Sequence, residues 1–105
     1  MSATKEAMIV LGELSAMHQY ATEQEAEGAS PKDIKFYDWA IHNFAWEIIH
    51  QLKIHPDGLQ EFCDLHAAVL DAYPEMLAEH NRERVEVAER LFNYYRQAYK
   101  MEGLA

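Results

Sequence analysis

The feature that most constrains the fold is the stretch Ser30–Lys53, which combines a strong helix start with apolar residues around most of its circumference. Ser30 is a favourable N-cap, Pro31 suits the first helical position, and Asp33 complements the free N–H groups of the first turn. Two apolar rows follow the helical period: Ile34, Tyr37, Ile41, Phe44, Ile48 and Leu52 in one, and Trp39, Trp46 and Ile49 in the other. Two rows need neighbours on two sides, so the sequence predicts a central helix that other helices cover on most of its surface.

Three other segments have the same helical spacing of apolar residues. A first helix is expected from Ser2 or Thr4 to about Glu27, a third from about Asp57 to Ala72, and a fourth from Pro74 to about Met101. Gly12, inside the first segment, allows a neighbouring helix to approach closely. The predicted fold is an all-α antiparallel bundle of about four helices with a long C-terminal helix, forming a single domain over residues 1–105.

The connections between these segments are short. Pro56 and Gly58 mark a turn after the second helix, which predicts that the second and third helices are antiparallel neighbours. Pro74 interrupts the pattern after the third helix. It either begins a separate fourth helix or kinks one continuous rod.

The acidic residues are distributed unevenly along the chain. There are 18 acidic and 9 basic residues, for a formal charge of −9, yet residues 54–81 contain no Lys or Arg. The acidic residues of the third helix and the start of the fourth are Asp57, Glu61, Asp64, Asp71, Glu75 and Glu79. Direct binding to nucleic acid or to an anionic membrane is not expected, because both need a cationic patch. A basic protein surface is the expected partner, although a solvated face that only keeps the protein in solution explains the same row.

The spacing of these carboxylates limits what they can imitate. Along a helix axis they lie about 5 to 6 Å apart, whereas one DNA strand carries a phosphate about every 3.4 Å. Imitation of a phosphate backbone therefore needs a second acidic row, from Glu23, Glu25 and Glu27 or from another subunit.

Four residues form a candidate metal site. Glu47 and His50 are three residues apart on the second helix, and Cys63 and His66 have the same spacing on the third. If these helices form an antiparallel hairpin, the two pairs lie at matching heights and offer the N, O and S ligands that zinc accepts. The alternative is that Cys63 and His66 belong to the core while Glu47 and His50 face solvent.

The sequence gives little support to catalysis. His42 lies between Trp39 and Trp46, one turn after Asp38, which fits either an acid–base residue or a histidine held by a carboxylate. There is no glycine-rich phosphate loop and no nucleophile elbow. No catalytic residue is predicted, and no cofactor is expected outside the metal alternative.

The last helix has more apolar and aromatic residues than one bundle face needs. The residues in question are Leu91, Phe92, Tyr94, Tyr95 and Tyr99. Because aromatic residues are enriched at protein–protein interfaces, they predict a homodimer contact. The alternative is that they form part of an ordinary core.

Together these features favour a non-enzymatic, acidic protein-interaction module. Small acidic helical proteins without catalytic motifs include inhibitors of nucleic-acid-handling enzymes, such as those that mobile genetic elements or phages use against host defences. The alternative is a helical bundle that binds Zn or Fe through Glu47, His50, Cys63 and His66. A lone Cys63, no apolar run of about 18 residues and no leader pattern at Met1 predict a cytoplasmic protein that does not insert into membranes.

Overall fold

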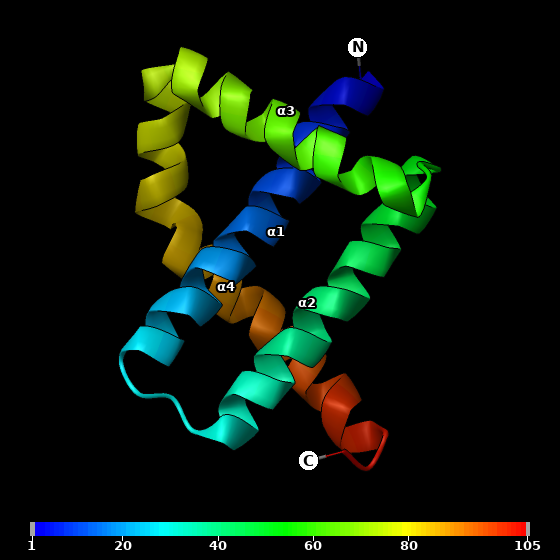
Figure 1. The fold of residues 1–105 in the computed structure, drawn as a ribbon, viewed down its shortest axis with the longest axis vertical. Coiled ribbons are helices and arrows are strands. Elements are labelled where there is room, and N and C mark those ends of the chain that lie inside the picture. Colours follow the sequence, from blue (N-terminus) through cyan, green and yellow to red (C-terminus); the bar gives the residue numbers. More distant parts are fainter. Residues whose placement is uncertain (1, 105) are drawn as a thin grey trace.

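The computed structural model describes residues 2–104, with side chains from residue 5 onward, and this part of the chain is an all-α bundle (Figure 1). Its helices are α1 (Ser2–Ala26), α2 (Pro31–Leu52), α3 (Leu59–Ala72) and α4 (Pro74–Met101), with a short 3-10 helix, η1 (Pro56–Gly58), before α3. The fold class and the long C-terminal helix predicted from the sequence are confirmed. Among the described residues, no helix combines the length and apolar character needed to cross a bilayer.

The start of α2 follows the predicted chemistry. Ser30 is extended, with φ −66° and ψ 154°, and its hydroxyl accepts a hydrogen bond from the backbone N–H of Asp33 at 3.2 Å. Pro31 occupies the first turn, where its missing N–H leaves no helical hydrogen bond unmade. The helix ends at Lys53, which adopts a left-handed conformation with φ 53° and donates its N–H to the carbonyl groups of the last turn.

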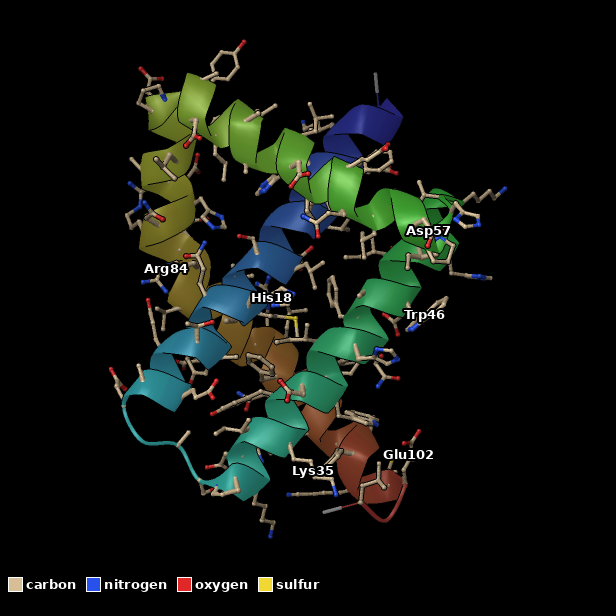
Figure 2. The ribbon with its side chains drawn as sticks, in the orientation of Figure 1. His18, Lys35, Trp46, Asp57, Arg84 and Glu102 are labelled. Carbon is tan, nitrogen blue, oxygen red and sulfur yellow. The ribbon has the colours of Figure 1, made fainter. Side chains whose placement is uncertain are left out.

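The central helix of the bundle is α1, not α2. Helix α1 contacts α2, α3 and α4, whereas α2 packs mainly against α1 and α4. In Figure 1, α1 and α2 lie side by side in opposite directions and α4 passes behind them. The outer side of α2 is open: the Trp46 side chain is 50% exposed and points away from the bundle (Figure 2). The prediction that α2 is covered on most sides is therefore wrong, because its second apolar row is only partly buried.

The core is a cluster of aromatic rings between α2 and α4, closed by α1. Phe36 and Tyr37 of α2 meet Phe92 and Tyr99 of α4, with centroid distances of 4.8 Å for Tyr37–Phe92 and 5.2 Å for Phe36–Tyr99. The Arg96 guanidinium lies 4.2 Å from the centroid of Phe36. These rings are largely removed from water, so their packing contributes strongly to the free energy of folding.

Helix α3 departs from the predicted hairpin. It crosses in front of α1 in Figure 1 and packs against α1 and α4 instead of lying along α2. The prediction that the second and third helices are antiparallel neighbours is therefore wrong. The turn through η1 redirects the chain, and α3 buries only His66 and Leu70. Tyr73, with φ −125° and ψ 86°, separates α3 from α4, so the two are distinct helices and not one kinked rod.

The corner formed by α3 and α4 projects from the rest of the bundle. The radius of gyration is 14.2 Å, compared with about 13 Å for a compact domain of about 100 residues. The difference fits an arm that adds surface to the molecule without adding much core (Figure 1).

Loss of the α2 cap is expected to destabilise the protein. The Ser30→Ala variant loses the acceptor for the Asp33 N–H, and we expect the free energy of unfolding to fall by about 1 kcal/mol. Urea unfolding monitored by circular dichroism measures the change. Ser30→Asp keeps an acceptor at the same position and should unfold near the wild-type midpoint. Equal stability of Ser30→Ala and wild type would contradict the role of the cap.

Candidate functional site

Six acidic residues lie on η1, α3 and the start of α4, and we call this set the acidic face. Its six carboxylates are all exposed, as the sequence predicted them to be: Asp57, Glu61, Asp64, Asp71, Glu75 and Glu79. Within residues 5–104, none of them forms an ion pair with Lys or Arg. The nearest partners are neutral or weakly basic: Asp57 lies 3.5 Å from His55, and Asp64 accepts a hydrogen bond from Gln60 at 2.9 Å. Among the described side chains, the negative charge of this face is therefore not neutralised by ion pairs.

The acidic face also exposes large apolar side chains. Leu65 on α3 is 50% exposed, Tyr73 at the corner is 59% exposed, and Met76 at the start of α4 is 44% exposed. Glu61 and Leu65 are four residues apart and lie on the same side of α3, away from buried His66. A surface that mixes carboxylates with accessible apolar groups has the composition of a protein-binding surface more than that of a purely solvated one.

The predicted metal ligands are not brought together. Glu47 and His50 border a shallow depression on the outer side of α2, whereas Cys63 and His66 line a cavity beneath α3. Across the side chains described here, no group of three or more His, Cys, Asp or Glu residues is arranged to hold a metal ion. The physical reason is the direction of α3: because it packs across α1, the matching heights that the hairpin required do not occur.

Three of the predicted interface residues are used inside the protein. Phe92, Tyr95 and Tyr99 are buried in the aromatic core, so their side chains are not available to a second subunit. Leu91 packs against the same core, and only Tyr94 is well exposed, at 66%. Burial, followed by the negative charge of Glu47, raises the pKa of the Tyr95 phenol. The predicted interface is thus reduced to Tyr94 and the accessible part of Leu91.

His42 is held by a tryptophan and not by a carboxylate. The indole N–H of Trp46 donates to Nε2 of His42 at 3.0 Å, and both side chains are exposed on the outer side of α2. Asp38 borders the same shallow depression as His42 and His18 but makes no hydrogen bond with either. This arrangement stabilises the surface of α2, and it does not present a shaped pocket for acid–base chemistry.

A second feature, which the sequence did not reveal, is a pair of histidines between α3 and α4. His66 is the one buried polar residue among the described side chains, and its ring centroid lies 6.0 Å from that of His80. Gly12 of α1 faces both rings: a Cβ placed there would lie 3.5 Å from Nε2 of His66 and 3.9 Å from Nδ1 of His80. Gly12 was recognised in the sequence as a point where another helix can approach closely, but its spacing did not indicate that two histidines lie there.

The surroundings of the histidine pair favour the neutral form of both rings. Burial lowers the pKa of His66, and the proximity of His80 lowers it further. Burial also lowers the pKa of His80, with a further contribution from the Arg84 guanidinium. The Arg84 guanidinium in turn forms an ion pair with the Glu23 carboxylate of α1, with a nitrogen-to-oxygen distance of 2.5 Å. Other charged groups lining this junction are Glu13 on α1 and Glu79, Glu83 and Arg90 on α4.

Comparison of the chain with models of protein families, with curated proteins and with solved structures gives no match.

The neutral histidine pair predicts a loss of stability in mild acid. A histidine whose pKa is lower in the folded state binds protons more readily when the protein is unfolded. Its stabilising effect is therefore fully present above about pH 6.5, the ordinary histidine value, and is lost as the pH falls through the lowered folded-state values. We expect the melting temperature of wild type to fall more between about pH 7.5 and about pH 5 than that of the double variant His66→Gln/His80→Gln.

A matched substitution serves as the control. His50→Gln/His55→Gln removes two exposed histidines and should keep the wild-type pH dependence. If the His66/His80 variant and wild type had parallel melting profiles over this range, the junction would not be the acid-sensitive element.

Proposed function

We propose that this chain is a non-enzymatic binding module whose acidic face engages a basic surface of a partner protein. The observation that carries the proposal is the set of six exposed carboxylates on η1, α3 and the start of α4, none paired with Lys or Arg among the described side chains. Uncompensated charge of one sign speeds the encounter with a partner of opposite sign and selects against acidic partners.

The apolar residues on the same face support a protein partner over a simple ionic one. Charge at an exposed surface contributes mainly to the association rate and is screened by salt. Stable binding also needs apolar area that becomes buried, and Leu65, Tyr73 and Met76 offer such area among the carboxylates. A partner with basic residues around an apolar patch matches this surface.

A nucleic-acid-binding surface of an enzyme is the class of basic partner that best fits. Such a surface presents clustered Lys and Arg over a wide area, and the six carboxylates extend over α3 and the first turns of α4. On this proposal the chain acts as a cytoplasmic inhibitor that occupies the basic groove, as mobile-element or phage counter-defence proteins do. The wide spacing of the carboxylates implies that it covers the groove and does not reproduce a phosphate backbone.

Charge reversal on the acidic face is expected to abolish partner binding. The triple variant Glu61→Lys/Asp64→Lys/Asp71→Lys changes the charge of the face by +6 at three exposed positions and leaves the buried residues His66 and Leu70 in place. We expect proteins captured from a cell extract by wild type to be lost with this variant, and binding of a purified captured partner to weaken by at least about tenfold. Wild-type binding should also weaken steeply as salt is raised.

The control carries the same charge change elsewhere. Glu25→Lys/Glu27→Lys/Glu102→Lys also alters the charge by +6, at exposed positions outside the acidic face. It should retain the partners of wild type. Loss of binding in both variants would indicate a dependence on net charge alone, and retention in both would remove the acidic face from the proposal.

The homodimer proposed for this chain rests on Tyr94 on α4. Because Phe92, Tyr95 and Tyr99 are buried, substitution of those residues would unfold the protein, whereas Tyr94 is exposed. We expect Tyr94→Glu to shift the protein toward monomer in sedimentation velocity experiments, since it places a charge in an apolar contact. Val85→Glu, at another exposed apolar position of α4, is the control. A wild type that sediments as a monomer at high concentration would contradict the dimer.

A further inference from the structure

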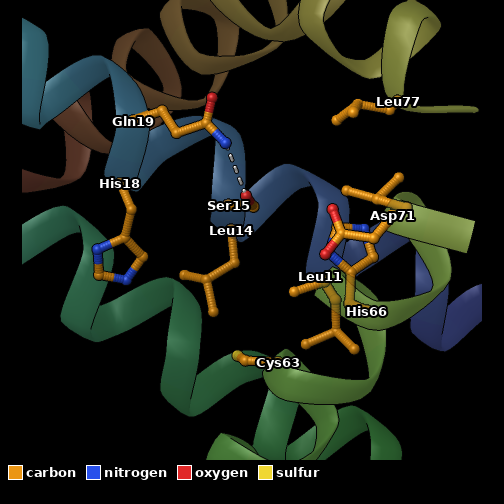
Figure 3. A pocket seen from close by; sticks show the side chains of 11 residues that line it. Leu11, Leu14, Ser15, His18, Gln19, Cys63, His66, Asp71 and Leu77 are labelled. Atoms are coloured by element: carbon orange, nitrogen blue, oxygen red, sulfur yellow. Dashed lines mark hydrogen bonds between the residues drawn. The ribbon is translucent and has the colours of Figure 1, made fainter. Parts of the chain in front are cut away.

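The cavity beneath α3 has the properties of a small-molecule site. It lies between α1 and α3, has a volume of about 360 Å³, and falls in the size range of ligand pockets. Its walls are mostly apolar and include Leu11 and Leu14 of α1, Leu70 of α3 and Leu77 of α4. Figure 3 shows Leu11 and Leu14 of α1 facing the same space as His66 of α3, with Cys63 at one side.

The second observation concerns the burial and the hydrogen bonding of His66. Its side chain is more than nine-tenths buried, at 7% exposure, and borders the cavity. It makes no hydrogen bond to any side chain or backbone group that the structure describes. A His66 ring nitrogen that faces the cavity has no partner among the described residues, so its hydrogen bond comes from water or from a ligand.

The other polar groups of the cavity do not fill this role. The Gln19 side-chain amide donates to the Ser15 hydroxyl at 3.2 Å (Figure 3), so both are already engaged. His18 and Asp71 are exposed residues that border the cavity. His66 is therefore the polar group within the apolar walls that is free to bind a ligand.

We propose that this cavity binds a small, uncharged aromatic heterocycle that forms a hydrogen bond with His66. The size follows from volume: a dry apolar cavity of about 150 Å³ accepts benzene, and this one is a little more than twice as large, which suits two fused rings. The lack of charge follows from the walls: any ion would lose its hydration against the leucine side chains, and the one carboxylate at the border, Asp71, is exposed and not buried. The apolar walls of the cavity are distinct from the acidic face, although Asp71 of that face lies at the border of the cavity.

Indole and 1-methylindole are matched probes for this site. Both have the fused rings, but only indole carries an N–H that can donate to His66. In ¹H–¹⁵N NMR titrations we expect indole to bind saturably with a Kd of roughly 1 mM or lower. The shifts should centre on Leu14, Cys63 and His66, including the His66 ring nitrogens. Binding of 1-methylindole should be weaker by about threefold to tenfold, the worth of one hydrogen bond.

Two neighbouring alanines on α3 provide a variant and its control. Ala67 and Ala68 are both exposed, but only Ala67 borders the cavity. Ala67→Phe places a ring across the opening without altering the core, and should weaken indole binding by at least about tenfold. Ala68→Phe adds the same ring outside the cavity and should leave the affinity within about twofold of wild type.

Several results would overturn the proposal. They are the absence of saturable shifts at about 5 mM indole, shifts centred on the exposed Trp46 side of α2, or unchanged binding by Ala67→Phe. Equal affinity for indole and 1-methylindole would remove His66 as the recognition group. Spectra of each variant without probe establish that it is folded, so that loss of binding reports on the cavity.

Discussion

The packing of aromatic rings from α2 and α4 against α1 is the interaction on which the rest of the structure depends. Tyr20 of α1 lies between the two sets of rings, 5.9 Å from Tyr37 and 5.5 Å from Phe92 by centroid distance. The contact with Phe92 joins residues more than 50 positions apart, and together the two contacts fix the relative positions of the three long helices. With that core complete, α3 is left to cover one end of α1 and to display its outer side. Helix α3 differs from the helices that form the core in carrying carboxylates but no Lys or Arg.

The sequence predicted the elements better than their arrangement. Helix starts at Ser30 and Pro74 follow from local chemistry, since a cap and a proline at the first turn act over a few residues. The direction of α3 depends on the three residues of η1 and on which helix offers the best apolar contact, and neither is visible in a spacing pattern. The same limit explains the prediction of α2 as the central helix: Trp46 has the right spacing to be buried, but no neighbour reaches it.

The candidate sites show the same contrast between local and long-range information. Exposure of the acidic face was predictable, because carboxylates at helical spacing without basic neighbours are almost never buried. The aromatic residues of α4 were ambiguous, since core and interface use the same residue types, and the structure places most of them in the core. The cavity at His66 was not predictable, because it exists only where α3 crosses α1 and brings positions 14 and 63 to the same space.

Helix α3 is attached through only two fully buried side chains, His66 and Leu70. Regions with few buried contacts open locally at a lower free energy than the whole molecule unfolds. The amide protons of α3 should therefore exchange with solvent when this helix alone detaches. Those of α2 and the second half of α4 should exchange only when the whole protein unfolds. Helix α3, which carries much of the acidic face, is thus the helix that detaches at the lowest free energy. Its orientation can adjust to a bound molecule without disturbing the aromatic core.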